Sequence, residues 1–145
     1  MKKSKLITVL GTACILSACS AQTSFQPMNE QVELKVNKNA PITIAKNVSQ
    51  TYSTTSFGQY VFKASSEGKE PIYGVIPLKF NGGYLAADIL FFAPAMFFNL
   101  REVYPHYQFD LNVGVVRYKK KEEDSWVTYI PTKEEAERAI QYFNN

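Results

Sequence analysis

Alternation between apolar and polar residues, the pattern of a strand with one buried face, first becomes clear at residues 32–36. This stretch reads VELKV, so that every second residue is aliphatic and the residues between them are charged. The same alternation returns in QYVFKAS at 59–65, where Tyr60, Phe62 and Ala64 share a face. Further strands are predicted at 42–45, 72–80, 107–116 and 125–130.

Two of these predicted strands differ in the regularity of their apolar–polar alternation. Residues 72–80 contain Gly74 and Pro77, and a proline inside a strand is typical of a sheet edge or a bulge. Residues 107–116, YQFDLNVGVV, alternate without a break. We expect the face formed by Phe109, Leu111 and Val113, together with Trp126, to make the main core.

Polar stretches separate the strands, and a helix is predicted at the C-terminus. Residues 46–58 are rich in Ser, Thr and Asn and are predicted to be a loop. The mixed-charge run KKKEED at 119–124 is predicted to be a solvated hairpin loop. Thr132 and Glu135 have the spacing of a capping box, which predicts that a helix begins there.

The longest apolar stretch of the domain lies at residues 84–100. As a helix, its 17 residues would be about 26 Å long, shorter than the roughly 30 Å core of a bilayer. Asp88 near its start and Pro94 in its middle oppose a membrane span. We expect a kinked helix in the core or at a partner interface. The alternative is a helix partly inserted at the membrane surface.

These elements predict the fold class α+β. We expect a small, mainly antiparallel β domain with a central apolar helical segment and a C-terminal helix, forming a single globular domain over residues 31–145. Residues 19–30 have no periodicity and are small or polar, and they are predicted to be a flexible tether.

The N-terminus carries a targeting pattern. Three lysines within the first five residues precede an uncharged, mostly apolar run that ends at Cys19. The residues LSAC at 16–19 resemble the lipobox of bacterial lipoproteins. The resemblance implies that residues 1–18 are a signal peptide, that cleavage precedes Cys19, and that Cys19 carries acyl chains. Ser20 resembles the signal for passage to the outer membrane in hosts that have two membranes.

Removal of this segment changes the charge and the cysteine content. The chain has 16 Lys and Arg against 13 Asp and Glu, and loss of the three lysines leaves 13 of each. This neutral balance, without a basic patch, argues against a nucleic-acid partner. Cys14 lies within the signal, so Cys19 is the one remaining cysteine and the domain must be stable without a disulfide.

Residues with catalytic potential are scarce. His106 is the only histidine, so we expect neither a metal site nor a Cys-His nucleophile, and no cofactor. Aromatic residues beside polar ones suggest a possible binding surface formed by Tyr52, Phe57, Tyr104 and His106. The alternative is that the aromatic side chains at these positions pack locally.

A further resemblance concerns residues 55–117. A strand region, a Gly-led apolar segment and NLREVYPHYQFDLNVGV are similar to the C-terminal half of small bacterial envelope lipoproteins with PEGA-like β-domains. The resemblance implies a surface-binding or structural module. The glycines that usually occur in the apolar segment of that group are mostly missing here.

The predicted function is a non-enzymatic lipoprotein of the cell envelope. The acyl chains on Cys19 would bind it to a membrane, most simply the outer membrane facing the periplasm or the surface, and its partner would be another envelope protein or a glycan. The alternatives are a hydrolase, or a hydrolase inhibitor, that acts on cell-wall or glycan material, and a lipoprotein that perturbs membranes through residues 84–100.

Overall fold

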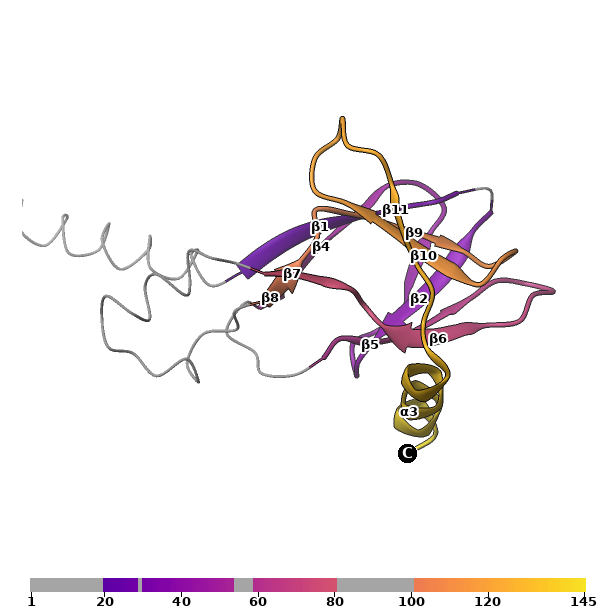
Figure 1. The fold of residues 1–145 in the computed structure, drawn as a ribbon. Coiled ribbons are helices and arrows are strands. Elements are labelled where there is room, and N and C mark those ends of the chain that lie inside the picture. The colour runs from indigo at the N-terminus through magenta and orange to yellow at the C-terminus, as the bar shows by residue number, and fades with distance from the viewer. Residues whose placement is uncertain (1–19, 29, 54–58, 81–100) are drawn as a thin grey trace, which may run out of the picture.

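The computed structural model describes residues 20–28, 30–53, 59–80 and 101–145. In these residues, eleven strands form two main sheets and one short hairpin, and a single helix follows at the C-terminal end (Figure 1). The class α+β with mainly antiparallel strands is confirmed. The predicted helical segment over 84–100 lies outside the described residues.

The four-stranded sheet has the order β3-β2-β5-β6 and is entirely antiparallel. Its strands are β2 (Val32–Val36), β3 (Ile42–Ile44), β5 (Val61–Ser65) and β6 (Ile72–Val75). The alternation at 32–36 and 59–65 predicted both central strands and their buried faces correctly, because Leu34, Phe62 and Ala64 are fully buried. Short connections join β2 to β3 and β5 to β6, whereas the central strands β2 and β5 pair although β3 and β4 lie between them in the chain.

The five-stranded sheet has the order β11-β10-β9-β1-β4. Its strands are β1 (Ser20–Gln26), β4 (Val48–Ser53), β9 (His106–Asp110), β10 (Val115–Lys119) and β11 (Val127–Tyr129). β1 pairs antiparallel with β4 and parallel with β9, whereas the other pairs are antiparallel. The sheet therefore combines the start, the middle and the end of the chain.

The prediction of a flexible tether over residues 19–30 is wrong for Ser20–Gln26, which form an internal strand of this sheet. The inward positions of β1 are Ala21, Thr23 and Phe25, and two of these three residues are too small or too polar to mark a strand. Thr23 is nevertheless buried, because its hydroxyl donates a hydrogen bond of 2.6 Å to the carbonyl oxygen of Tyr104. The folded domain thus includes Ser20–Gln26 and does not begin at residue 31.

The predicted loop over 46–58 is likewise wrong for β4 (Val48–Ser53). Serine and threonine occupy solvent-facing positions of this strand, and its inward residue Tyr52 packs into the core. β4 is an edge strand, so polar residues on its outer face are compatible with pairing. Residues 54–58 lie outside the described residues.

The long strand predicted at 107–116 is a hairpin. β9 ends at Asp110, β10 begins at Val115, and Gly114 between them has a φ of 70°, a left-handed conformation that glycine adopts readily. Leu111 is buried as predicted, but Val113 points to solvent with 64% of its surface exposed. Trp126 is only half-buried, so the predicted core face is correct for Phe109 and Leu111 and wrong for Val113 and Trp126.

The segment 72–80 is divided into β6 and β7 (Leu78–Phe80), and Pro77 lies between them, in agreement with the predicted interruption. β7 pairs with β8 (Arg101–Val103) in the short hairpin. Gly74 permits the close approach of the chain before the helix, because a Cβ atom at this position would lie 2.9 Å from Pro131. Only a residue without a side chain fits there.

The C-terminal helix α3 (Lys133–Asn144) begins as predicted. Thr132 is the N-cap, and both hydrogen bonds of the capping box with Glu135 are present. Among its apolar residues, Ala139 is fully buried and Ile140 is partly exposed. The helix packs mainly on β6 and also on β5, and thereby covers part of the four-stranded sheet (Figure 1).

The core lies between the two main sheets. The ring of Phe25 in β1 contacts Tyr107 and Phe109 in β9, with centroid distances of 5.8 and 5.9 Å. Phe109 also meets Phe62 of the other sheet at 5.2 Å, so aromatic contacts connect both sheets in one cluster. In the described part of the chain, no helix is long and apolar enough to cross a membrane.

Candidate binding site

A cavity of about 380 Å³ opens where β10 ends and the loop before β11 begins. We call it the Tyr104 pocket. Its lining residues come from the β8–β9 connection, β10, the following loop and β11: Tyr104, Tyr118, Lys119, Lys120, Asp124, Ser125 and Val127. Aromatic rings and charged groups therefore line the same hollow, a combination typical of sites for polar ligands with an apolar face.

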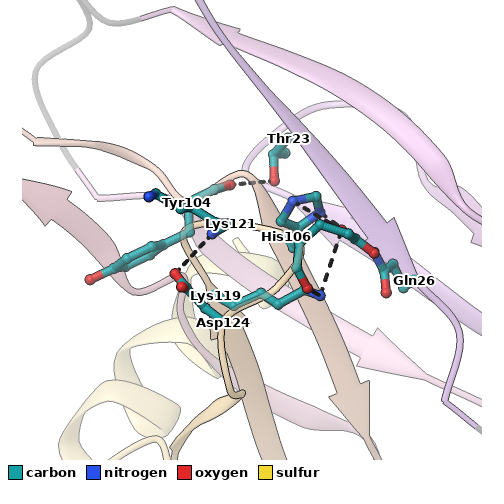
Figure 2. A network of polar contacts seen from close by, with 8 residues as sticks. Thr23, Gln26, Tyr104, His106, Lys119, Lys121 and Asp124 are labelled. Carbon is teal, nitrogen blue, oxygen red and sulfur yellow. Dashed lines mark hydrogen bonds and ion pairs between the residues drawn. The ribbon is translucent and has the colours of Figure 1, made fainter.

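Hydrogen bonds on both sides hold the backbone of Tyr104. Its carbonyl oxygen accepts from Thr23 of β1, as Figure 2 shows, and its N–H donates to the hydroxyl of Tyr107 at 2.8 Å. The Tyr107 hydroxyl donates in turn to the carbonyl oxygen of Pro77 at 2.5 Å. Tyr104 is therefore positioned by buried neighbours, although it lies outside the regular strands.

The rings of Tyr104 and Tyr118 form one wall of the pocket. Their centroids are 4.2 Å apart and their planes are inclined by 32°, a close but tilted arrangement. Burial is the main cause that raises the pKa of Tyr104, and the neighbouring Tyr118 raises it further. The Tyr104 hydroxyl thus stays protonated at neutral pH and can donate a hydrogen bond.

Lys119 contributes a charge that is largely removed from solvent, since only 7% of its side chain is exposed. Its Nζ donates to the carbonyl oxygen of Glu122 at 2.5 Å and lies 3.5 Å from the Glu122 carboxylate. The same Nζ lies 4.9 Å from the ring centroid of Trp126. These contacts attach the loop and the tryptophan to the end of β10.

His106 is the cross-strand partner of Lys119, and both side chains contact the carboxylate of Glu122. Its Nε2 lies 3.3 Å from Glu122, and its Nδ1 lies 3.5 Å from the side-chain nitrogen of Gln26 (Figure 2). With a proton on Nε2 the ring can donate to Glu122, and Nδ1 can accept from the side-chain nitrogen of Gln26. His106 therefore links β1 to the loop beside the pocket.

The four predicted binding-surface residues have different positions. Tyr104 lines the pocket and His106 lies next to it, joined through Lys119 and Glu122. Tyr52 does not belong to this surface: it is 93% buried, its ring packs on Tyr60 at 5.0 Å, and burial strongly raises its pKa. Phe57 and the predicted lipidation site Cys19 lie outside the described residues.

Of the residues that line the pocket, only Tyr104 was predicted from the sequence. Tyr118 and Lys119, like the other lining residues, were not predicted, and Trp126 beside Lys119 was expected in the core. The charge run after Tyr118 suggested only a solvated loop. A prediction that β9 pairs with β10 would have found them, because this pairing places Lys119 opposite His106 and Tyr118 opposite Tyr107. That pairing could not be recognised while residues 107–116 were interpreted as a single strand.

Two of the other hollows in the described part of the chain have volumes comparable to that of the Tyr104 pocket. A shallow one of about 510 Å³ is lined by Gln31, Glu33, Ser65, Ser66 and Glu67. A groove of about 480 Å³ lies between the β9–β10 turn and α3. The Tyr104 pocket differs from both because it combines closely packed aromatic rings with a buried lysine.

Within the residues that the structure describes, no group of three or more His, Cys, Asp or Glu side chains could hold a metal ion. The acidic residues at and beside the pocket already have partners, since Asp124 accepts from the backbone N–H of Lys121 at 3.0 Å and Glu122 contacts Lys119 of β10 and His106 of β9. The site can donate and accept hydrogen bonds and stack a ring, which is the chemistry of recognition.

Comparison of the chain with protein-family models, curated proteins and solved structures finds no match.

Proposed function

We propose that this protein is a lipid-anchored lipoprotein of the bacterial cell envelope that binds an envelope glycan without catalysing a reaction. The lipobox-like residues 16–19 and the lysines before them support attachment through acyl chains on Cys19. Two or three acyl chains hold a protein stably on a membrane, so no spanning helix is needed. The outer membrane is the proposed location, because serine follows Cys19.

The observation that carries the binding role is the closely packed pair Tyr104 and Tyr118 beside polar groups in one cavity. A sugar ring has an apolar face that packs on an aromatic ring, and hydroxyl groups around its edge that need hydrogen-bonding partners. The pocket offers both, with Lys120, Asp124 and Ser125 at its wall. A saccharide therefore suits it better than a purely apolar ligand does.

A hydrolase acting on the same material is the alternative. Glycoside hydrolysis needs two carboxyl groups that face each other across the scissile bond, and one of them must be held protonated. At the Tyr104 pocket, Asp124 is instead exposed and accepts a hydrogen bond from Lys121, and the exposed Glu122 nearby is paired with His106 and Lys119. This arrangement favours binding over hydrolysis.

The binding role is tested with soluble saccharide fragments of the cell wall, measured by calorimetry or NMR titration. Tyr118→Ala should weaken binding at least about fivefold, since loss of an aromatic contact with the ligand costs about 1 kcal/mol or more. Tyr142→Ala on α3, outside the pocket, is the matched control and should bind as the unmodified protein does. Equal affinities of the two variants would contradict the proposal.

The anchor is tested separately. Cys19→Ala should abolish incorporation of a fatty-acid analogue in cells and leave the protein unprocessed or released from the membrane fraction. Continued labelling of this variant would show that Cys19 is not the acylated residue.

We also propose that residues 84–100 form the central helical segment and pack against protein. Their length, Asp88 and Pro94 support this assignment over insertion into lipid. Flotation of the unlipidated chain with vesicles, abolished by exchange of Phe92 and Phe97 for serine without loss of the fold, would contradict it.

A further inference from the structure

Four chain positions gather at one end of the domain. Ser20, the first residue of β1, is paired with Ser53, the last residue of β4. Phe80 at the end of β7 is paired with Arg101 at the start of β8. Figure 1 shows the β7–β8 hairpin beside the first half of β1, so both pairs lie at the same end.

The pairing of β1 with β9 explains this arrangement. Ser24 is level with His106 in the parallel register, and the residues before His106 continue alongside β1. The N–H of Ser24 donates to the carbonyl oxygen of Pro105 at 2.7 Å, and the hydroxyl of Thr23 donates to the carbonyl oxygen of Tyr104 at 2.6 Å. The start of β8 is therefore close to the start of β1.

We propose that this end of the domain, which we call the Ser20 end, rests directly on a lipid bilayer. The inference depends on the proposed acylation of Cys19. Adjacent Cα atoms are about 3.8 Å apart, so the acylated residue would be one peptide unit from Ser20. β1 pairs with β4 from its first residue, Ser20, to Phe25, and this leaves no slack between anchor and domain.

The side chains at the Ser20 end suit a membrane interface. Phe80 has 61% of its surface exposed, and Arg101 beside it is also exposed. Aromatic rings and long cationic side chains favour the headgroup region, where the apolar part enters lipid and the charge stays with phosphates and water. Lys79 is paired with Glu102 at 2.7 Å in the same hairpin.

The opposite end supplies a matched reference position. Val113 in the β9–β10 turn is 64% exposed, nearly the same fraction as Phe80. β9 runs parallel to β1, so its last residue, Asp110, and the turn after it point away from the Ser20 end. The proposed orientation therefore places Phe80 at the lipid and Val113 in water.

The experiment uses the processed, acylated full chain in vesicles made of phospholipid alone. Phe80→Cys and Val113→Cys each introduce one free thiol, because Cys14 leaves with the signal and the Cys19 sulfur is occupied by lipid. A fluorophore on each thiol is then quenched by nitroxide-labelled lipids. The label at position 80 should be quenched several-fold more strongly than the label at position 113.

Equal quenching at the two positions would overturn the orientation. The mass of the purified protein, measured in parallel, reports whether Cys19 is acylated. An acylated protein with equal quenching would refute only the orientation and keep the proposed lipoprotein. A protein without lipid would refute the anchor and the orientation together.

Discussion

The two main sheets share one core but are assembled differently. In the four-stranded sheet, β2 pairs with β3 and β5, and β5 pairs with β6. Its most distant paired residues are Glu33 and Ser65, 32 positions apart (65 − 33). In the five-stranded sheet, β1 pairs with β9, and Ser24 lies opposite His106 although 81 residues separate them. Long-range pairing brings a larger loss of chain entropy, which must be offset by buried contacts.

Because of this long-range pairing, β1 is the strand whose formation depends most on buried contacts. Its only fully buried large side chain is Phe25, which meets Tyr52, Tyr107 and Phe109. Without those contacts, β4 and β9 would lose the strand that lies between them. The four-stranded sheet spreads its buried side chains over several strands.

The largest effect is expected for Phe25→Ala. Loss of a fully buried aromatic ring costs about 3–5 kcal/mol of unfolding free energy, enough to unfold many small domains. Denaturant titration of the purified domain measures it. Phe80→Ala, which removes an exposed ring, should change stability by less than about 0.5 kcal/mol. Similar losses in the two variants would contradict the central role of β1.

Leu34→Ala tests the four-stranded sheet in the same way. Leu34 is fully buried in β2, and its truncation should cost about 2–5 kcal/mol. Hydrogen exchange should distinguish the sheets further: Phe25→Ala should deprotect β1 and β4 more than β2 and β5. Uniform deprotection of all four strands would show that the two sheets unfold as one unit.

Gly74→Ala addresses the junction between the four-stranded sheet and α3. The added Cβ would lie 2.9 Å from Pro131 and 3.1 Å from Phe62, and overpacking of this kind costs about 1–3 kcal/mol. The thermal midpoint should fall accordingly. Pro131→Gly in the same chain should reduce the additional cost of Gly74→Ala, and an undiminished cost would place the clash elsewhere.

Glu135→Gln probes the start of α3 with a smaller effect. Burial opposes ionisation of Glu135, but hydrogen bonds from Tyr129 and Thr132 outweigh it and hold its pKa below the usual value. A lowered pKa stabilises the fold above the unfolded pKa of about 4.3, and this contribution is lost as the pH falls through the folded pKa. The variant should lose about 0.3–1 kcal/mol at neutral pH.

The pH dependence provides the control for this variant. The difference in unfolding free energy between Glu135→Gln and the unmodified chain should shrink below the folded pKa, where both side chains are neutral. A difference that is constant across the acidic range would show that the charge of Glu135 does not stabilise the helix.

The smallest effect is expected for Val113→Ala, below about 0.5 kcal/mol, because this side chain is exposed in the β9–β10 turn. Leu111→Ala, two residues earlier, should cost about 2–5 kcal/mol. Thermal unfolding of both variants tests whether residues 107–116 form a hairpin or the continuous strand that their alternation suggests. Equal losses at 111 and 113 would favour the continuous strand.

The sequence alone was sufficient where a structure is local. The alternation at 32–36 and 59–65 predicted β2 and β5 with their buried faces, and the spacing of Thr132 and Glu135 predicted the start of α3. Each pattern depends on contacts within a few residues or between neighbouring strands. Of the candidate site, the sequence supplied Tyr104 and His106, because aromatic residues cluster around them.

The tertiary structure decided everything that depends on distant pairing. Ser20–Gln26 form a strand only because β4 and β9 provide hydrogen-bonding partners on both sides and Tyr104 provides the acceptor that Thr23 needs. The Tyr104 pocket depends on the same pairing, since Tyr118 and Lys119 reach it only when β10 folds back on β9. A polar stretch without periodicity becomes buried when distant segments satisfy its hydrogen bonds, and the local sequence does not indicate which segments these are.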